Sequence, residues 1–135
     1  MTSYYRDELA GLPEMGLVGR QLWSQSGLRP DDMDMAILYD HFTPYTLLQL
    51  EELGFCGRGE AKDFVREPGA LEVGGRLPLN THGGQLGEAY IHGMNGIAEG
   101  VRQIRGTSVN QVEAAEKVVV TAGTGVPTSG LVLTA

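Results

Sequence analysis

Two runs of apolar and β-branched residues end the chain, and they constrain its fold more than any other feature. KVVVTAG covers residues 117–123, and GLVLTA covers residues 130–135. Residues of this kind are enriched in strands, and the TGVPTS segment between the two runs is rich in turn-forming residues. Two strands joined by so short a turn lie next to each other in a sheet. We therefore expect a pair of neighbouring strands at the end of the fold.

Helical patterns precede this pair. Apolar side chains at helical spacing predict a helix over residues 15–26, ended by Gly27, and an amphipathic helix over residues 94–104. A helix between these two should begin with Thr43 as its N-cap and Pro44 as its first helical residue.

Short strands and one long loop fill the remaining segments. MAILYD, residues 35–40, and LPLN, residues 77–80, predict brief strands. The glycine-rich and charged residues 56–75 predict a loop with a helical turn near residues 62–66. Because helices and strands alternate before the final strand pair, we expect an α/β fold with a mixed sheet.

The composition narrows the class of protein. The length fits one domain spanning residues 1–135. A net charge of −7 with scattered basic residues argues against nucleic-acid binding. No stretch approaches the roughly 20 consecutive apolar residues of a membrane span, and the N-terminus lacks the pattern of a secretory signal. The single cysteine, Cys56, fits a reducing compartment, so we expect a cytoplasmic protein.

One glycine-rich segment carries the residues that suggest a function. NTHGGQLGEAYIHGMNG, residues 80–96, resembles the C-terminal catalytic loop of the thiolase superfamily, especially the sterol-carrier-protein-x type. Enzymes of that type have a pattern close to N-x-S-G-G-x-x-x-x-G-H-P-x-G-A-T-G. The positions that match it without a gap are Asn80, Gly83, Gly84, Gly93 and Gly96.

Two further segments extend the resemblance over nearly the whole chain. YDHF, residues 39–42, is similar to the H-D-C-F motif of those thiolases, and the terminal TAGTGVPTSGLVLTA resembles the segment that normally carries a catalytic cysteine. The resemblance implies a thiolase-like C-terminal domain, a layered α/β fold with a mixed sheet of the five-stranded type. It also implies that the N-terminal thiolase half is absent from this sequence.

The departures from the thiolase motifs concern the reactive residues. Tyr90 stands at the histidine of G-H-P, and Tyr39 stands at the histidine of H-D-C-F. Ser129 or Gly130 occupies the place of the terminal cysteine. A thiolase needs a thiolate to carry the acyl group, and Cys56 lies in a charged loop between the motifs. The usual Claisen chemistry is therefore not expected.

Tyrosine at both histidine positions resembles the aldolase branch of the family, the lipid-transfer proteins of actinobacterial sterol catabolism. Members of that branch cleave a β-hydroxyacyl-CoA side chain by a retro-aldol reaction, which gives a ketosteroid and propionyl-CoA. The resemblance implies an acyl-CoA substrate, with coenzyme A present only as part of that substrate and no other cofactor. It implies as partners an N-terminal thiolase half, a protein with a DUF35 domain, or both, in a homo- or hetero-oligomer.

Within this resemblance, Tyr39 and Tyr90 are the expected catalytic pair. A retro-aldol cleavage removes a proton from a hydroxyl group and later returns one to the enolate carbon. A phenol with an ordinary pKa of about 10 can do this where a cation or a dipole lowers that pKa. Structural tyrosines with bonded hydroxyl groups are the alternative at both positions.

The neighbouring polar residues are expected to support these tyrosines. Asp40, His41, His82 and His92 either orient the phenols and bind substrate, or act as local turn and cap residues. The histidine spacings fit no established metal-ligand pattern, so no metal is expected. The residues expected to shape the loop are Asn80, Gly83, Gly84 and Gly93. Two other functions remain open: a non-catalytic interaction or dimerisation module, and a lipid-transfer acyl-CoA thiolase.

Overall fold

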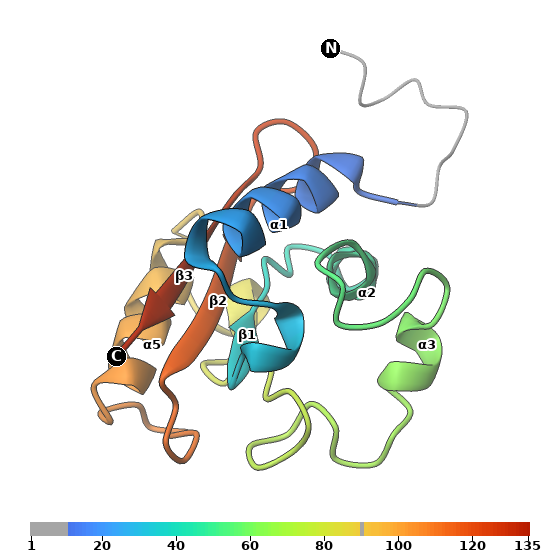
Figure 1. The fold of residues 1–135 in the computed structure, drawn as a ribbon. Helices are drawn as coiled ribbons and strands as arrows, with labels where there is room; N and C mark the ends of the chain where they lie inside the picture. The colour runs from blue at the N-terminus through green and yellow to red at the C-terminus, as the bar shows by residue number, and fades with distance from the viewer. Residues whose placement is uncertain (1–10, 90) are drawn as a thin grey trace.

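The computed structural model describes residues 11–89 and 91–135, which form helices on both faces of a small sheet (Figure 1). Its elements, in chain order, are α1 (Pro13–Ser26), the 3-10 helix η1 (Pro30–Asp32), β1 (Met35–Ile37), α2 (Thr43–Glu52), α3 (Ala61–Phe64), α4 (Gly84–Gly87), α5 (Met94–Ile104), β2 (Lys117–Ala122) and β3 (Ser129–Thr134). Within the described residues, no helix is long and apolar enough to cross a membrane.

The sheet has the strand order β1-β2-β3. β1 runs parallel to β2, with Met35 opposite Val118, and β2 pairs with β3 in antiparallel fashion. The predicted neighbouring strands at the end of the chain are therefore confirmed, as is the predicted α/β class with a mixed sheet. Successive side chains point to opposite faces of a sheet, so the strands contribute to two separate apolar clusters. The helices α1 and α2 pack on one face of the sheet, and α5 packs on the other.

The sheet in the described residues has three strands, fewer than the five-stranded type expected. The predicted strand over residues 77–80 is reduced to one bridge between Ala36 and Leu79. This pairing cannot extend, because the next backbone groups, those of Leu38, are bonded by the side chain of Asn80 instead of a strand. Side-chain bonds of this kind compete with a ladder for the same donors and acceptors.

The helices near the N-terminus follow the predicted pattern, with one correction. Gly27 ends α1 in the left-handed conformation, and its amide donates to the Trp23 carbonyl oxygen. The N-cap of α2 is Phe42, so the expectation for Thr43 was wrong by one position, and the cap has no side-chain hydrogen bond. Pro44 is tolerated there because the first helical amides have no partner within the helix. The predicted helical turn in the long loop is α3.

The helix α5 exists as predicted, but its apolar stripe is only partly covered: Ile97 and Ile104 pack against the core, whereas the residues at the start of the stripe do not. Met94 is 59% exposed and Ala98 is exposed, whereas the buried residues of α5 are Asn95, Gly96, Glu99, Gly100 and Gln103. A Cβ atom on Gly100 would lie 2.7 Å from Leu133 Cδ1, so glycine lets α5 pack closely against the sheet. The spacing of apolar residues alone could not predict that polar residues and glycines would be the most deeply buried residues of α5.

The buried carboxylate on this side, Glu99, is satisfied by three donors. Its Oε1 accepts hydrogen bonds from Thr81 Oγ1 at 2.6 Å, Ser108 Oγ at 2.7 Å and Gln103 Nε2 at 3.0 Å. Burial by itself would raise the pKa of Glu99, but these hydrogen bonds, with the charge of His82 nearby, hold that pKa below its ordinary value of 4.5. The network joins α5 to the loops on either side of it.

We expect Glu99→Gln to change how stability depends on pH. Because the folded-state pKa of Glu99 lies below the unfolded value, its ionised form stabilises the fold above about pH 4.5. That contribution is lost as the pH falls through the lowered pKa. Urea unfolding between pH 7 and pH 3 should show a lower stability for Glu99→Gln at neutral pH and a smaller loss towards acid. Glu113→Gln removes an exposed carboxylate and is the matched control. Identical pH profiles for the wild type and Glu99→Gln would contradict this account.

Candidate active site at the ends of β1 and β2

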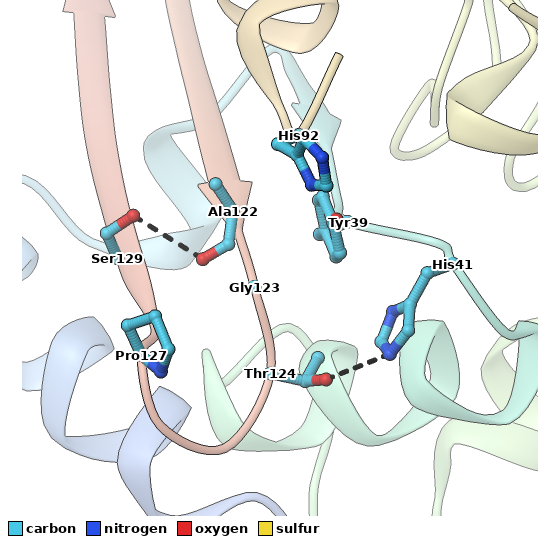
Figure 2. Close-up of a pocket in the computed structure, with 8 residues that line it drawn as sticks. All are labelled: Tyr39, His41, His92, Ala122, Gly123, Thr124, Pro127 and Ser129. Atoms are coloured by element: carbon cyan, nitrogen blue, oxygen red, sulfur yellow. Dashed lines mark hydrogen bonds between the residues drawn. The ribbon is translucent and has the colours of Figure 1, made fainter. Parts of the chain in front are cut away.

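A pocket of about 410 Å³ lies where the chain leaves the parallel strands β1 and β2 (Figure 2). The carboxyl ends of parallel strands are a common place for ligands in α/β folds. The residues that line the pocket are Tyr39, His41, His92, Ala122, Gly123, Thr124, Pro127 and Ser129. Three segments far apart in the sequence therefore meet there: the residues after β1, those before α5, and the β2–β3 turn.

The position of Tyr39 follows from the way β1 ends. Asn80 Oδ1 accepts from the Leu38 amide at 2.8 Å, and Asn80 Nδ2 donates to the Leu38 carbonyl oxygen at 3.0 Å. The Tyr39 amide donates to Thr121 Oγ1 at 3.0 Å, and Gln49 Nε2 donates to the Tyr39 carbonyl oxygen at 2.7 Å. The backbone groups of Leu38 and Tyr39 are thus bonded although they lie beyond β1. Tyr39 is 7% exposed and contributes to the pocket wall.

His41 stands next to Tyr39 in the pocket and belongs to a cluster of rings. Its ring centroid lies 5.1 Å from that of Tyr39, and it stacks on Tyr45 at 4.9 Å with an interplanar angle of 16°. His41 Nε2 lies 3.2 Å from Thr124 Oγ1 (Figure 2). Its Nδ1 is buried and has no hydrogen-bond partner among the described residues. A buried polar atom without a partner is costly, and because this nitrogen is closed off from solvent, a ligand would reach it only if the ring or its neighbours moved.

Asp40 fastens the glycine-rich loop to the end of β1. Its Oδ1 accepts from the Gln85 amide at 2.6 Å. A Cβ atom on Gly84 would overlap the Asp40 carboxylate, so the close contact requires glycine there. Gln85 Nε2 in turn donates to Asn95 Oδ1 at 2.7 Å, which ties the loop to the first turn of α5. The loop before it has Gly83 in the left-handed region, with φ of 95°.

Gly93 brings the start of α5 against the pocket. Its φ is 91°, and a Cβ atom there would lie 2.8 Å from the Cβ atom of Ala122 and 3.9 Å from Tyr39 Cδ2. His92, the preceding residue, lines the pocket beside Tyr39 (Figure 2). Tyr90, the other expected catalytic residue, lies outside the described residues. The part of its loop that is described reaches the same pocket as Tyr39.

His82 is not among the pocket residues. Both of its ring nitrogens are buried without a hydrogen-bond partner among the described residues, and its charge acts on Glu99. The sequence therefore groups three histidines that the structure separates into His41 and His92 at the pocket and His82 elsewhere. Among the described residues, no three histidine, cysteine or acidic side chains come close enough to hold a metal ion.

The single cysteine of the chain, Cys56, lacks the features of an activated nucleophile. Cys56 does not line the pocket and packs at the edge of the core between the sheet and the first helices. Burial raises the pKa of the Cys56 thiol, and the carboxylates of Glu51 and Glu60 raise it further. A thiol with a raised pKa is mostly protonated near neutral pH and reacts slowly. Ser129, one of the two residues that stand in place of the terminal cysteine, has its hydroxyl 3.4 Å from the Ala122 carbonyl oxygen.

Three polar residues of the site are absent from the sequence-based expectations. Gln49 and Thr121 bond the Tyr39 backbone, and Thr124 contacts His41. The sequence pattern that could have indicated two of them is a polar residue inside an apolar run: Gln49 in LLQL and Thr121 in VVVT. Such a residue is buried only with partners, but the pattern does not identify those partners.

Comparisons with known proteins agree with the motifs and the fold. The family model "Thiolase C-terminal domain-like" matches residues 4–134. The chain is 80% identical over 133 residues to the 17-hydroxy-3-oxo-4-pregnene-20-carboxyl-CoA lyase of Mycobacterium tuberculosis, covering 98% of this chain and 34% of that protein. It is 74% identical, with the same coverage, to the steroid side-chain-cleaving aldolase of Thermomonospora curvata.

A solved structure gives the same result in three dimensions. The chain matches the "Ltp2-ChsH2(DUF35) aldolase" with a TM-score of 0.94 and 73% sequence identity, covering 98% of this chain and 34% of that one. The chain thus spans about a third of the length of these relatives. The family match extends over nearly all of the sequence, and the chain belongs to the thiolase C-terminal domain-like family.

Proposed function

We propose that this chain is the C-terminal half of a thiolase-fold aldolase that cleaves the β-hydroxyacyl-CoA side chain of a steroid-type substrate. The observation that carries the proposal is a pocket with a tyrosine and two histidines in its wall and no thiol among its lining residues. The 80% identity to a protein named as a steroid acyl-CoA lyase supports the same reaction class.

The proposed reaction needs proton transfer and no covalent acyl-enzyme. A base removes the proton of the β-hydroxyl group, the bond between the α- and β-carbons breaks, and its electron pair forms the thioester enolate. A ketone leaves, and an acid returns a proton to the enolate carbon. We assign these two transfers to Tyr39 and Tyr90, without assigning which phenol acts as the base. Coenzyme A takes part only as the thioester of the substrate.

The surroundings of Tyr39 suit this assignment. Its backbone is fixed by buried hydrogen bonds, so the phenol is held at the pocket without spending free energy on reorganisation during the reaction. His41 lines the same pocket with its ring 5.1 Å from that of Tyr39, and we propose that it binds the substrate or orients the phenol. His92 has the same supporting role from the opposite segment, while Asp40, Asn80 and the loop glycines hold the backbone.

Two other functions are less consistent with the site. An acyl-CoA thiolase needs an activated cysteine, and the Cys56 thiol has a raised pKa and lies outside the pocket. A non-catalytic interaction module would not need a pocket whose tyrosine backbone is fixed by buried polar side chains. We keep the module as the runner-up, because the chain spans only 34% of its relatives.

An apolar surface beside α5 supports a partner. Ile91 and Met94 are 54% and 59% exposed and line a hollow of about 450 Å³ that reaches Arg102. Leu86, earlier in the same loop, is 65% exposed. Exposed apolar groups that gather in this way often mark contacts with another protein. We propose that an N-terminal thiolase half or a DUF35-domain protein covers this surface in a homo- or hetero-oligomer. The cytoplasmic location stays a prediction from the sequence.

We expect Tyr90→Phe and Tyr39→Phe to lower turnover in the assembled enzyme by roughly 100- to 10,000-fold, the usual cost of losing a general acid or base. Each change removes one hydroxyl group and keeps the ring. Turnover of 17-hydroxy-3-oxo-4-pregnene-20-carboxyl-CoA, the substrate in the name of the relative, should be measured per folded enzyme. His82→Ala is the matched control, since His82 lies outside the pocket lining. Near-normal turnover of both tyrosine variants, with loss of turnover in His41→Ala or His92→Ala, would assign the chemistry to a histidine.

We expect Met94→Glu to weaken association with the proposed partner by at least about tenfold, because it puts a charge into an apolar contact. The side chain is exposed, so the fold should stay intact. Val109→Glu is the matched control, since Val109 is also exposed but does not line the hollow. Analytical ultracentrifugation of the chain with an N-terminal thiolase half or a DUF35 protein measures the effect. Equal binding by both variants would exclude this surface as the contact.

A further inference from the structure

Gln49 and Thr121 form a closed ring of hydrogen bonds with the backbone of Tyr39. The Tyr39 amide donates to Thr121 Oγ1 at 3.0 Å, the Thr121 hydroxyl donates to Gln49 Oε1 at 2.6 Å, and Gln49 Nε2 donates to the Tyr39 carbonyl oxygen at 2.7 Å. The three residues come from α2, from β2 and from the segment after β1, and they are up to 82 positions apart in the sequence.

The directions of these bonds are fixed, because each group has a single role. The Thr121 hydroxyl has one proton, which goes to Gln49, so its oxygen is left to accept from Tyr39. The second proton on Gln49 Nε2 is directed to the Tyr45 carbonyl oxygen at 3.2 Å. Gln49 is fully buried and Thr121 is 2% exposed, so water does not compete for these bonds. The ring therefore defines one position for the Tyr39 backbone.

Packing alone does not explain a glutamine at this place in α2. Gln49 lies next to Leu48 and Leu50, and Leu50 is part of the apolar core. Burying an amide among apolar side chains is unfavourable unless its donors and acceptor are all bonded. An apolar residue of similar size would fill the same volume without that requirement. What the amide adds is a bond to Tyr39, the residue that reaches the pocket.

We infer that Gln49 and Thr121 are positioning residues for Tyr39, and that their hydrogen-bonded ring sets the direction in which its phenol enters the pocket. The role rests on the proposed function, in which Tyr39 transfers a proton. β1 ends at Ile37, so the strand ladder no longer fixes Tyr39, and the ring replaces it. Errors of about 1 Å in the placement of a catalytic group can cost roughly 100-fold in rate.

Turnover by the assembled enzyme with 17-hydroxy-3-oxo-4-pregnene-20-carboxyl-CoA provides the first test. Thr121→Val keeps the shape of the side chain and removes the hydroxyl group, whereas Thr121→Ser keeps the hydroxyl. We expect Thr121→Val to lower kcat on the order of 10- to 100-fold with little change in KM, and Thr121→Ser to retain most of the turnover. Gln49→Leu should lower kcat similarly. The double variant should lose little more than the worse single variant, because residues that act as a unit are not additive.

A second readout does not depend on activity. When tyrosine is labelled with ¹³C at Cζ, the NMR spectrum shows one signal for each tyrosine ring. The signal that disappears in Tyr39→Phe is that of Tyr39. Thr121→Val should shift or broaden that signal, and Thr121→Ser should leave it in place. Val118→Ala is the matched control, since Val118 is a fully buried residue of the same strand and takes no part in the ring. It should destabilise the fold without moving the Tyr39 signal or changing turnover per folded enzyme.

The two readouts separate failure of this inference from failure of the proposed function. An unshifted Tyr39 signal in Thr121→Val, or equal effects of Thr121→Val and Val118→Ala, would overturn the positioning role even if the enzyme is an aldolase. If the wild-type complex does not cleave the substrate, the proposed function fails. The labelled signal then decides alone whether Gln49 and Thr121 hold Tyr39.

Discussion

Leu38 and Tyr39 follow a strand of only three residues, and their backbone groups are bonded by the side chains of Asn80, Thr121 and Gln49. Side chains thus make the hydrogen bonds that a neighbouring strand would otherwise make. The same bonds position the glycine-rich loop next to Tyr39. The Asn80 bonds attach the glycine-rich loop to β1, and the Asp40 carboxylate then takes the Gln85 amide of the same loop. These bonds fix the backbone of Tyr39 beyond the end of the strand.

The packing of α5 has a second consequence for function. Its glycines approach the sheet, and its buried polar side chains are bonded by neighbouring loops. Ile97 and Ile104 pack against the core, but Met94 remains on the outer side. A surface helix usually turns its apolar residues towards a core. The exposed Met94 and the hollow beside it are understandable if a further domain or protein covers α5.

Local patterns in the sequence predicted much of the fold. The strand pair at the chain end, the helix stop at Gly27 and the helix α5 depend on short-range preferences that can be read directly. The placement of His82 and the burial of polar residues on α5 depend on contacts between distant segments, and the pattern did not indicate them. Gln49 and Thr121 are 72 positions apart, so their bond was also beyond sequence reasoning. Of the residues singled out in the motifs, Tyr39, His41 and His92 line one pocket, while Tyr90 lies outside the described residues. Their catalytic and supporting roles stay a prediction.

Carbon–carbon bond cleavage without a thiol nucleophile distinguishes the proposed aldolase from a thiolase, and the fate of solvent hydrogen measures it directly. The assembled enzyme should be incubated with the steroid acyl-CoA in D₂O, and the products analysed by mass spectrometry. Retro-aldol cleavage predicts a ketosteroid and propionyl-CoA with one deuterium at its α-carbon, formed without consumption of free coenzyme A. A product that requires free coenzyme A, or a covalent acyl group on Cys56, would contradict it.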